Sequence, residues 1–173
     1  MYIRFFLVLS VMFWYSSPVF SLNGNIIIQG DLVDEPCSLQ IGSELQTVKL
    51  GNIIKNTLYL HKRTVNYPFY ITLETCDISD KHQVEVSFNG EEDILQPGLL
   101  ATAGTAKGIA IGIKTEEGNK AEINRTITKY ELEGGNQTLT FYAYISASDA
   151  VIEQKSITEG DFSAYVSFML SYP

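Results

Sequence analysis

The stretch 161–173 limits the possible fold more than any other part of the sequence. Apolar residues alternate there with Ser, Tyr and Met, and the apolar set is Phe162, Ala164, Val166, Phe168, Leu170 and Tyr172. Strict alternation is typical of a β-strand with one buried face. We expect the strands that pair with this one to come from earlier in the sequence or from another molecule.

The first 21 residues have the pattern of an export signal. Arg4 precedes an apolar run over residues 5–15, and Val19-Phe20-Ser21 supplies the small-residue spacing of a cleavage site. The run is shorter than the ~20 residues that a membrane-spanning helix needs, which disfavours a transmembrane anchor. The pattern predicts a secretory signal peptide over residues 1–21.

The remaining 152 residues (173 minus 21) suit one domain with a proper core. The whole chain has 12 basic and 20 acidic residues, a net charge of −8, and removal of Arg4 makes it −9. Such a surface repels phosphate backbones and anionic lipids. Nucleic acids and membrane surfaces are therefore disfavoured as partners.

The chain has two cysteines, Cys37 and Cys76, and both follow the predicted signal. In an exported protein they permit one intramolecular disulfide, which we predict. The alternative is a thiol nucleophile or a metal ligand. His61 and His82 are the only histidines, and neither stands in a catalytic or metal-binding motif. No metal site and no cofactor are predicted.

Many short strands separated by turn residues account for most of the remaining chain. Strands are expected at 25–33, 38–41, 48–50, 68–76, 84–88, 99–102, 109–113 and 139–145, besides the last stretch. Residues 126–137 and 146–160 are expected to be loops, and Asn52 to Asn66 has no clean period and stays unassigned. Without alternation of strands and helices, the pattern predicts an all-β, immunoglobulin-like antiparallel β-sandwich.

The first predicted strand has the character of a detachable arm. Ile26, Ile28, Gly30 and Leu32 alternate along one face, and Pro36 follows in place of a hairpin turn. A free apolar strand is something proteins avoid unless it pairs with another chain.

Taken together, these motifs resemble the fimbrial (pilus) subunits of the bacterial chaperone-usher class. The resemblance covers the whole chain after the signal and rests on the order of its elements: the arm with Gly30, then Cys37, Val48-x-Leu50-Gly51, Pro68-Phe69-x-Ile71-x-Leu73-x-x-Cys76, Val84-x-Val86-x-Phe88-Asn89-Gly90, Gly108-Ile109-x-Ile111, Leu139-x-Phe141-x-Ala143 and the penultimate Tyr172.

The resemblance implies a sandwich that lacks its last strand and is completed by donor-strand complementation. Residues 22–36 would be the amino-terminal donor-strand extension, with Ile26, Ile28, Gly30 and Leu32 as its donated face, and residues 37–173 would be the pilin domain. The acceptor groove and chaperone contact would be bordered by Phe162, Ala164, Val166, Phe168, Leu170 and Tyr172. Glycine in the donated face fits a narrow point of the groove.

The implied function is a structural subunit, rod or minor adaptor, of a fimbrium that supports adhesion at the bacterial surface. Its implied partners are a periplasmic chaperone, an outer-membrane usher and neighbouring pilin subunits. It would reach the cell surface through the periplasm, and no small-molecule substrate is expected.

Two other classes remain open from the sequence. One is a monomeric secreted or periplasmic β-sandwich that binds a ligand and pairs the arm with its own last strand. The other is an extracellular hydrolase using paired carboxylates, for which the candidates are Asp31, Asp34, Glu35, Glu91, Glu92 and Asp93. These acidic residues lie in turns and loops, which favours a solvated surface and a protein that is not an enzyme.

Overall fold

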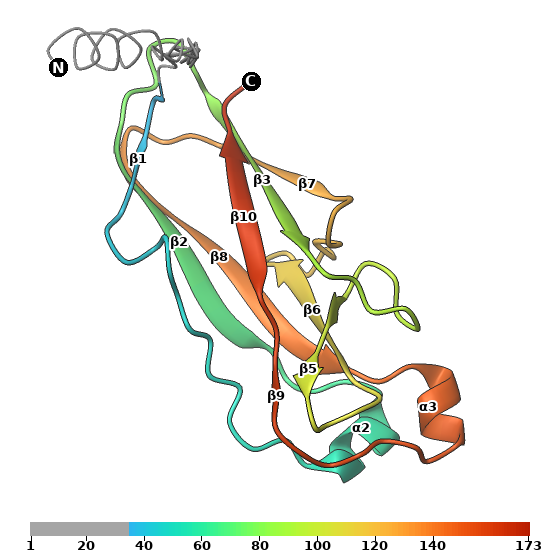
Figure 1. Cartoon of the computed structure of the whole chain (residues 1–173). Helices are drawn as coiled ribbons and strands as arrows, with labels where there is room; N and C mark the ends of the chain where they lie inside the picture. Colours follow the sequence, from blue (N-terminus) through green and yellow to red (C-terminus); the bar gives the residue numbers. More distant parts are fainter. Residues whose placement is uncertain (1–34) are drawn as a thin grey trace, which may run out of the picture. The chain divides into compact units, whose positions relative to one another are not determined.

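Two antiparallel sheets form most of the regular structure in the computed structural model, which describes residues 35–173. The larger sheet has the order β1-β2-β8-β6-β4, with bounds Ser38–Leu39, Tyr67–Cys76, Gly135–Ser146, Ala110–Thr115 and Leu100–Ala101. The smaller sheet has the order β10-β3-β7, with bounds Val166–Ser171, Gln83–Gly90 and Ile127–Glu131 (Figure 1). A separate pair joins β5 (Ala103–Gly104) to β9 (Phe162–Ser163).

The two sheets pack through the apolar faces of their central strands. Phe141 of β8 stacks on Phe69 of β2, with ring centroids 5.6 Å apart. Phe88 of β3 packs edge-on against the Phe141 ring, with the ring centroids 4.9 Å apart. Aromatic side chains remove large apolar areas from water, so this cluster joins the sheets at their centre. The predicted all-β antiparallel sandwich is confirmed.

Two short helices occupy segments that the sequence did not assign to helices. The segment left unassigned, 52–66, contains α2 (Lys55–His61), and the predicted loop 146–160 contains α3 (Asp149–Glu153). The loop prediction for 149–153 was therefore wrong. α2 has 7 residues and buries Leu58, and α3 has 5 residues and buries Val151. Because each helix is short and buries one residue, neither shows an apolar period of 3.6 residues in the sequence.

One further loop prediction and one strand prediction need correction. The predicted polar loop 126–137 contains β7, which pairs with β3 from Ser87 opposite Ile127 to Gln83 opposite Glu131. Its polar composition fits an edge strand with one solvated face. The predicted strand at Val48 and Leu50 is instead irregular chain, whose apolar side chains pack on the core without pairing to a sheet.

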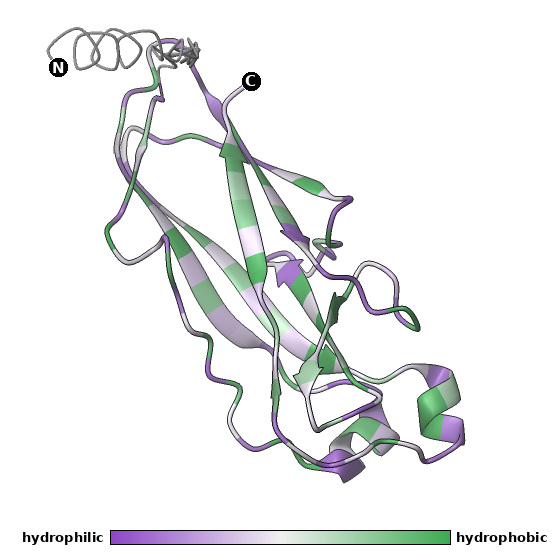
Figure 2. Cartoon of the chain, viewed as in Figure 1, coloured by the Kyte–Doolittle hydropathy of each residue, from purple (hydrophilic) through white to green (hydrophobic). Residues whose placement is uncertain are grey.

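The predicted carboxy-terminal strand is divided into two. β10 pairs with β3 from Val166 opposite Gly90 to Ser171 opposite Glu85, while β9 pairs with β5. The alternation nevertheless continues through the break at 164–165, and Figure 2 shows hydrophobic bands along β10. The division arises because β3 ends at Gly90, so the chain before Val166 has to take another partner.

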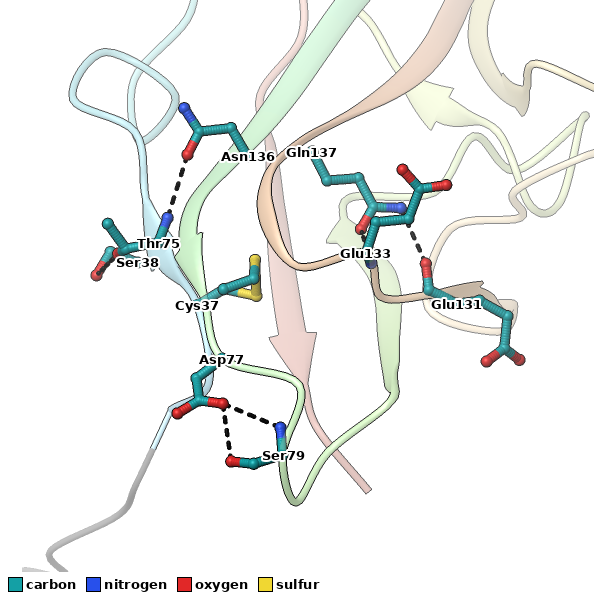
Figure 3. Close-up of a disulfide and its surroundings, with 10 residues drawn as sticks. Cys37, Ser38, Thr75, Asp77, Ser79, Glu131, Glu133, Asn136 and Gln137 are labelled. Carbon is teal, nitrogen blue, oxygen red and sulfur yellow. Dashed lines mark hydrogen bonds between the residues drawn. A yellow bond between two sulfur atoms is a disulfide. The ribbon is translucent and has the colours of Figure 1, made fainter.

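The predicted disulfide is present between Cys37 and Cys76, which are both buried (Figure 3). It joins the start of β1 to the end of β2. A backbone hydrogen bond from the Asp77 N–H to the Pro36 carbonyl, 2.7 Å long, lies beside it. The bond therefore fixes the residues that follow the predicted arm to the edge of the larger sheet.

Removal of the disulfide is expected to destabilise the domain. Replacing Cys37 and Cys76 together with Ala should lower the free energy of unfolding by about 2 to 5 kcal/mol, because the bond closes a loop of 39 residues. The variant should accumulate poorly in the periplasm, measured as soluble yield. Ser38→Ala, at an exposed neighbouring position, is the control. Equal yields of the variant and the control, or two free thiols in the unaltered protein by mass spectrometry, would contradict this prediction.

Candidate functional site at the carboxy-terminal strand

β10 is an edge strand of the smaller sheet. One edge pairs with β3, and the other has no strand partner within residues 35–173. An open edge presents backbone N–H and C=O groups in the spacing that another extended chain can pair with. β10 is therefore a place where a strand can be added.

The inward row of the last stretch is only partly covered. Its half-buried members pack against the core and are Phe162, Ala164, Phe168, Leu170 and Tyr172, while Val166 is 40% exposed. On the neighbouring strand β3, Val84 and Val86 are fully buried and Phe88 is 2% exposed. The two rows have similar hydrophobicity, but the row of the last stretch is more exposed to solvent than the row on β3. The core is therefore incompletely covered on the side of β10.

The aromatic contacts show which edges of the two sheets lie on the same side. Phe88 of β3 packs on Phe141 of β8 and also on Phe69 of β2, whereas Tyr130 of β7 packs on Phe141 of β8. Because β3 lies over both β2 and β8 while β7 lies over β8, the next strand, β10, lies on the side of β2 that leads to β1. The open edge of β10 therefore faces the edge formed by β1 and the chain that follows it.

A second apolar row comes from this opposite edge. Its half-buried residues pack against the same core, and they are Leu39, Val48, Leu50, Ile53 and Phe69. Sequence reasoning did not assign this row to the site. The signal in the sequence for this row was the alternation of Val48 and Leu50, which is typical of a short strand. Two incompletely covered apolar rows, one on each edge, are what an inserted strand would need on its two sides.

The end of β10 is held beside the start of the described chain. Lys81 Nζ donates a hydrogen bond to the Tyr172 carbonyl. Burial, with a smaller contribution from the negative charge of Glu35, raises the pKa of the Tyr172 hydroxyl. Glu35 thus lies near the carboxy-terminal end of β10.

The six predicted acceptor residues follow one face of the last stretch, as the alternation required. The role of that face in binding a strand stays a prediction. Ile26, Ile28, Gly30 and Leu32, the predicted donor residues, lie outside the described residues.

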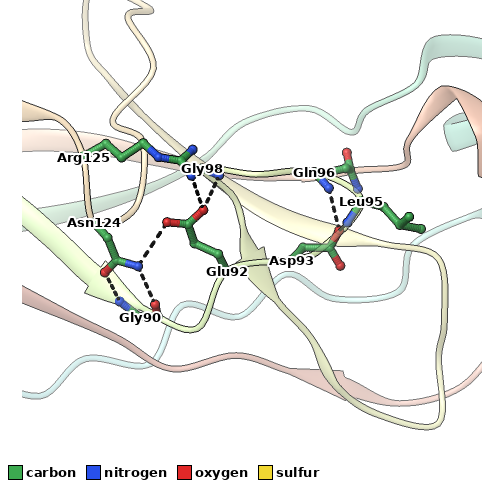
Figure 4. A network of polar contacts seen from close by, with 8 residues as sticks. All are labelled: Gly90, Glu92, Asp93, Leu95, Gln96, Gly98, Asn124 and Arg125. Atoms are coloured by element: carbon green, nitrogen blue, oxygen red, sulfur yellow. Dashed lines mark hydrogen bonds and ion pairs between the residues drawn. The ribbon is translucent and has the colours of Figure 1, made fainter.

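Two of the carboxylates considered for hydrolysis, Glu92 and Asp93, have structural roles. Glu92 Oε2 accepts hydrogen bonds from the Gly98 N–H at 3.0 Å and from Arg125 at 2.8 Å (Figure 4). These contacts, the backbone one foremost, lower the pKa of Glu92, whereas a general acid needs a raised one. Asp93 Oδ1 accepts from the N–H groups of Leu95 and Gln96 and closes the loop.

Neither a metal-binding group nor a membrane-spanning helix is found in the described part of the chain. No three residues among its His, Cys, Asp and Glu are placed to hold an ion. No helix in residues 35–173 has the length and apolar character to cross a bilayer.

Known proteins similar to this chain are fimbrial. The sequence model of the fimbrial protein family matches residues 22–173. Fimbria A protein of Serratia marcescens is 33% identical over 150 residues, 87% of this chain and 84% of that protein. Long polar fimbria protein A of Salmonella typhimurium is 35% identical over 156 residues, with the same two coverages.

Solved structures of pilus proteins have the same fold. The crystal structure of the P pilus rod subunit PapA matches with a TM-score of 0.70 at 27% identity, covering 80% of this chain and all of that one. A chaperone-usher pilus structure matches with a TM-score of 0.71 at 26% identity, covering 91% of this chain and all of that one. With the half-covered row along β10, these likenesses identify the chain as a member of the fimbrial protein family.

Proposed function

We propose that this chain is a structural subunit of a chaperone-usher fimbrium that polymerises by donor-strand exchange. The observation that carries the proposal is the contrast between two neighbouring strands. β10 is open at one edge and has a half-buried apolar row, whereas the inward row of β3 is buried. A strand inserted beside β10 would pair with its free backbone groups and cover both apolar rows.

Residues 22–36 supply that strand to a neighbouring subunit. Ile26, Ile28 and Leu32 enter the acceptor groove, where each contributes about 1.5 to 3 kcal/mol by burial. Gly30 passes the narrowest point, where a side chain would separate the two backbones. Residues 37–173 form the pilin domain that receives the strand of another copy.

The same groove explains the other partners. A periplasmic chaperone covers it by lending a strand before assembly, and at the outer-membrane usher the arm of the next subunit takes its place. Residues 1–21 direct export and are removed, and the assembled fibre stands on the cell surface, where it supports adhesion. Labelling the subunit in fibres and viewing them by electron microscopy tests its role, because a rod subunit labels the length and an adaptor labels one end.

The acceptor row can be tested with a matched pair of substitutions. Phe168→Asp places a charge in the row, where burial without a partner costs several kcal/mol, so the yield of chaperone-bound subunit should fall at least roughly tenfold. Met169→Asp adds the same charge to the next residue, which is 61% exposed, and should have little effect. The measurement is copurification with a co-expressed chaperone, and equal yields from the two variants would contradict the assignment.

A further inference from the structure

Lys114 is the one charged residue that is buried within the described chain, with 8% of its surface exposed. It lies on β6, on the face of the larger sheet that points away from the core, since its neighbour Ile113 belongs to the core. Tyr144 of β8 lies on the same face, opposite Gly112. A Cβ at Gly112 would collide with the Tyr144 ring, so the ring lies directly on the β6 backbone.

A second cation shares this ring. The guanidinium carbon of Arg63 and the ammonium nitrogen of Lys114 each lie 5.7 Å from the centroid of Tyr144. Arg63 is held in position because the next residue, Thr64, exchanges hydrogen bonds with Ile145: its N–H donates to the Ile145 carbonyl at 2.9 Å and its hydroxyl accepts from the Ile145 N–H at 3.0 Å. The backbone that carries Arg63 is therefore hydrogen-bonded to β8, the strand that carries Tyr144.

This cation pair has no carboxylate partner within residues 35–173. The ion pairs there involve other cations, namely Lys55, Lys62, Arg125 and Lys129. Burial, and then the charge of Arg63, lower the pKa of Lys114, and no carboxylate offsets them. Two neighbouring cations repel each other, and the buried one has also lost hydration. A bound anion offsets both costs.

We propose that Arg63, Lys114 and the Tyr144 ring form a carboxylate-binding site for an acidic side chain of a second copy of this chain in the fibre. The inference rests on the proposed function, because polymerisation brings the copies together. The chain carries 20 acidic residues against 12 basic ones, so a neighbouring copy presents mainly carboxylates to this site. Arg offers a planar fork and Lys a point charge, which together bind one carboxylate group tightly.

Carbodiimide treatment, which joins a carboxylate to an adjacent amine, tests the site in assembled fibres. Fibres are made from a mixture of isotope-labelled and unlabelled subunits, and peptides are identified by mass spectrometry. We expect Lys114 to be joined to an Asp or Glu of a different copy in fibres and not in the chaperone-bound subunit. The internal control is Lys129 with Glu85, which are 2.7 Å apart within one copy and should be joined in both samples.

Fibres that yield the control product without a Lys114 product between copies would overturn the inference and leave the proposed function intact. Failure to form fibres at all would instead count against the proposed function.

A substitution gives a second, independent measurement. Lys114→Met should lower the temperature at which fibres dissociate, because it leaves the neighbour's carboxylate without its partner, but should not lower the melting temperature of the chaperone-bound subunit. Lys120→Met, at an exposed lysine paired across the same turn, should leave both temperatures unchanged. No effect of Lys114→Met, or an effect of equal sign in both samples, would overturn the inference.

Discussion

Ile28→Asp is expected to leave the subunit folded and chaperone-bound and to abolish its addition to fibres. In the proposed assembly, Ile28 is buried in a neighbour's groove and takes no part in its own subunit's core. An aspartate there would be buried without a partner, at a cost of several kcal/mol, which exceeds what one apolar side chain contributes. The measurement compares the yield of chaperone-bound subunit with the yield of polymer.

The arm offers its own control for this experiment. Gln29→Asp adds the same charge to the other face of the predicted strand and should still polymerise. Gly30→Leu should behave like Ile28→Asp, since it places a side chain at the close backbone approach. If the arm paired with its own sheet, Ile28→Asp and Gly30→Leu would unfold the subunit even with the chaperone present, and that outcome would favour the monomeric ligand-binding alternative.

Expression without a chaperone is expected to have an effect of similar size. The rows along β10 and along the opposite edge are half-buried, and at ~25 cal/mol per Å² a few hundred Å² of uncovered apolar surface costs several kcal/mol. That is comparable to the net stability of a domain of this size. The free subunit should therefore aggregate or be degraded, measured as soluble monomer in periplasmic extracts with and without the chaperone.

Equal amounts of soluble monomer under the two conditions would mean that the sandwich is complete by itself. The disulfide has to be checked in both extracts, because loss of the Cys37–Cys76 bond would also lower the yield. A non-reducing gel separates the two causes.

The parts of the fold that were predictable are those where one face of a strand is buried. In β2, Ile71 and Leu73 are buried and alternate with more exposed neighbours, and β3 and β8 show the same pattern, so the sequence carries the period directly. β7 escaped prediction because it is short, polar and at an edge. The helices α2 and α3 each bury one residue, which leaves no period to detect.

The candidate site was predictable on one side only. The β10 row follows from local alternation, and so does the donated face proposed for the arm. The opposite row depends on tertiary packing: Leu39, Leu50 and Phe69 come from separate segments. Only the stacking of β3 over β2 and β8, and of β7 over β8, brings that edge towards β10. The division of the last stretch into β9 and β10 likewise depends on where β3 ends.

Donation of the arm would be visible in an electron cryomicroscopy map of the assembled fibre. We predict that residues 26–32 of one subunit run beside β10 of the next one, with Ile26, Ile28 and Leu32 directed between β10 and the edge formed by Leu39, Val48 and Leu50. A map in which residues 26–32 pair with β10 of their own subunit would contradict it.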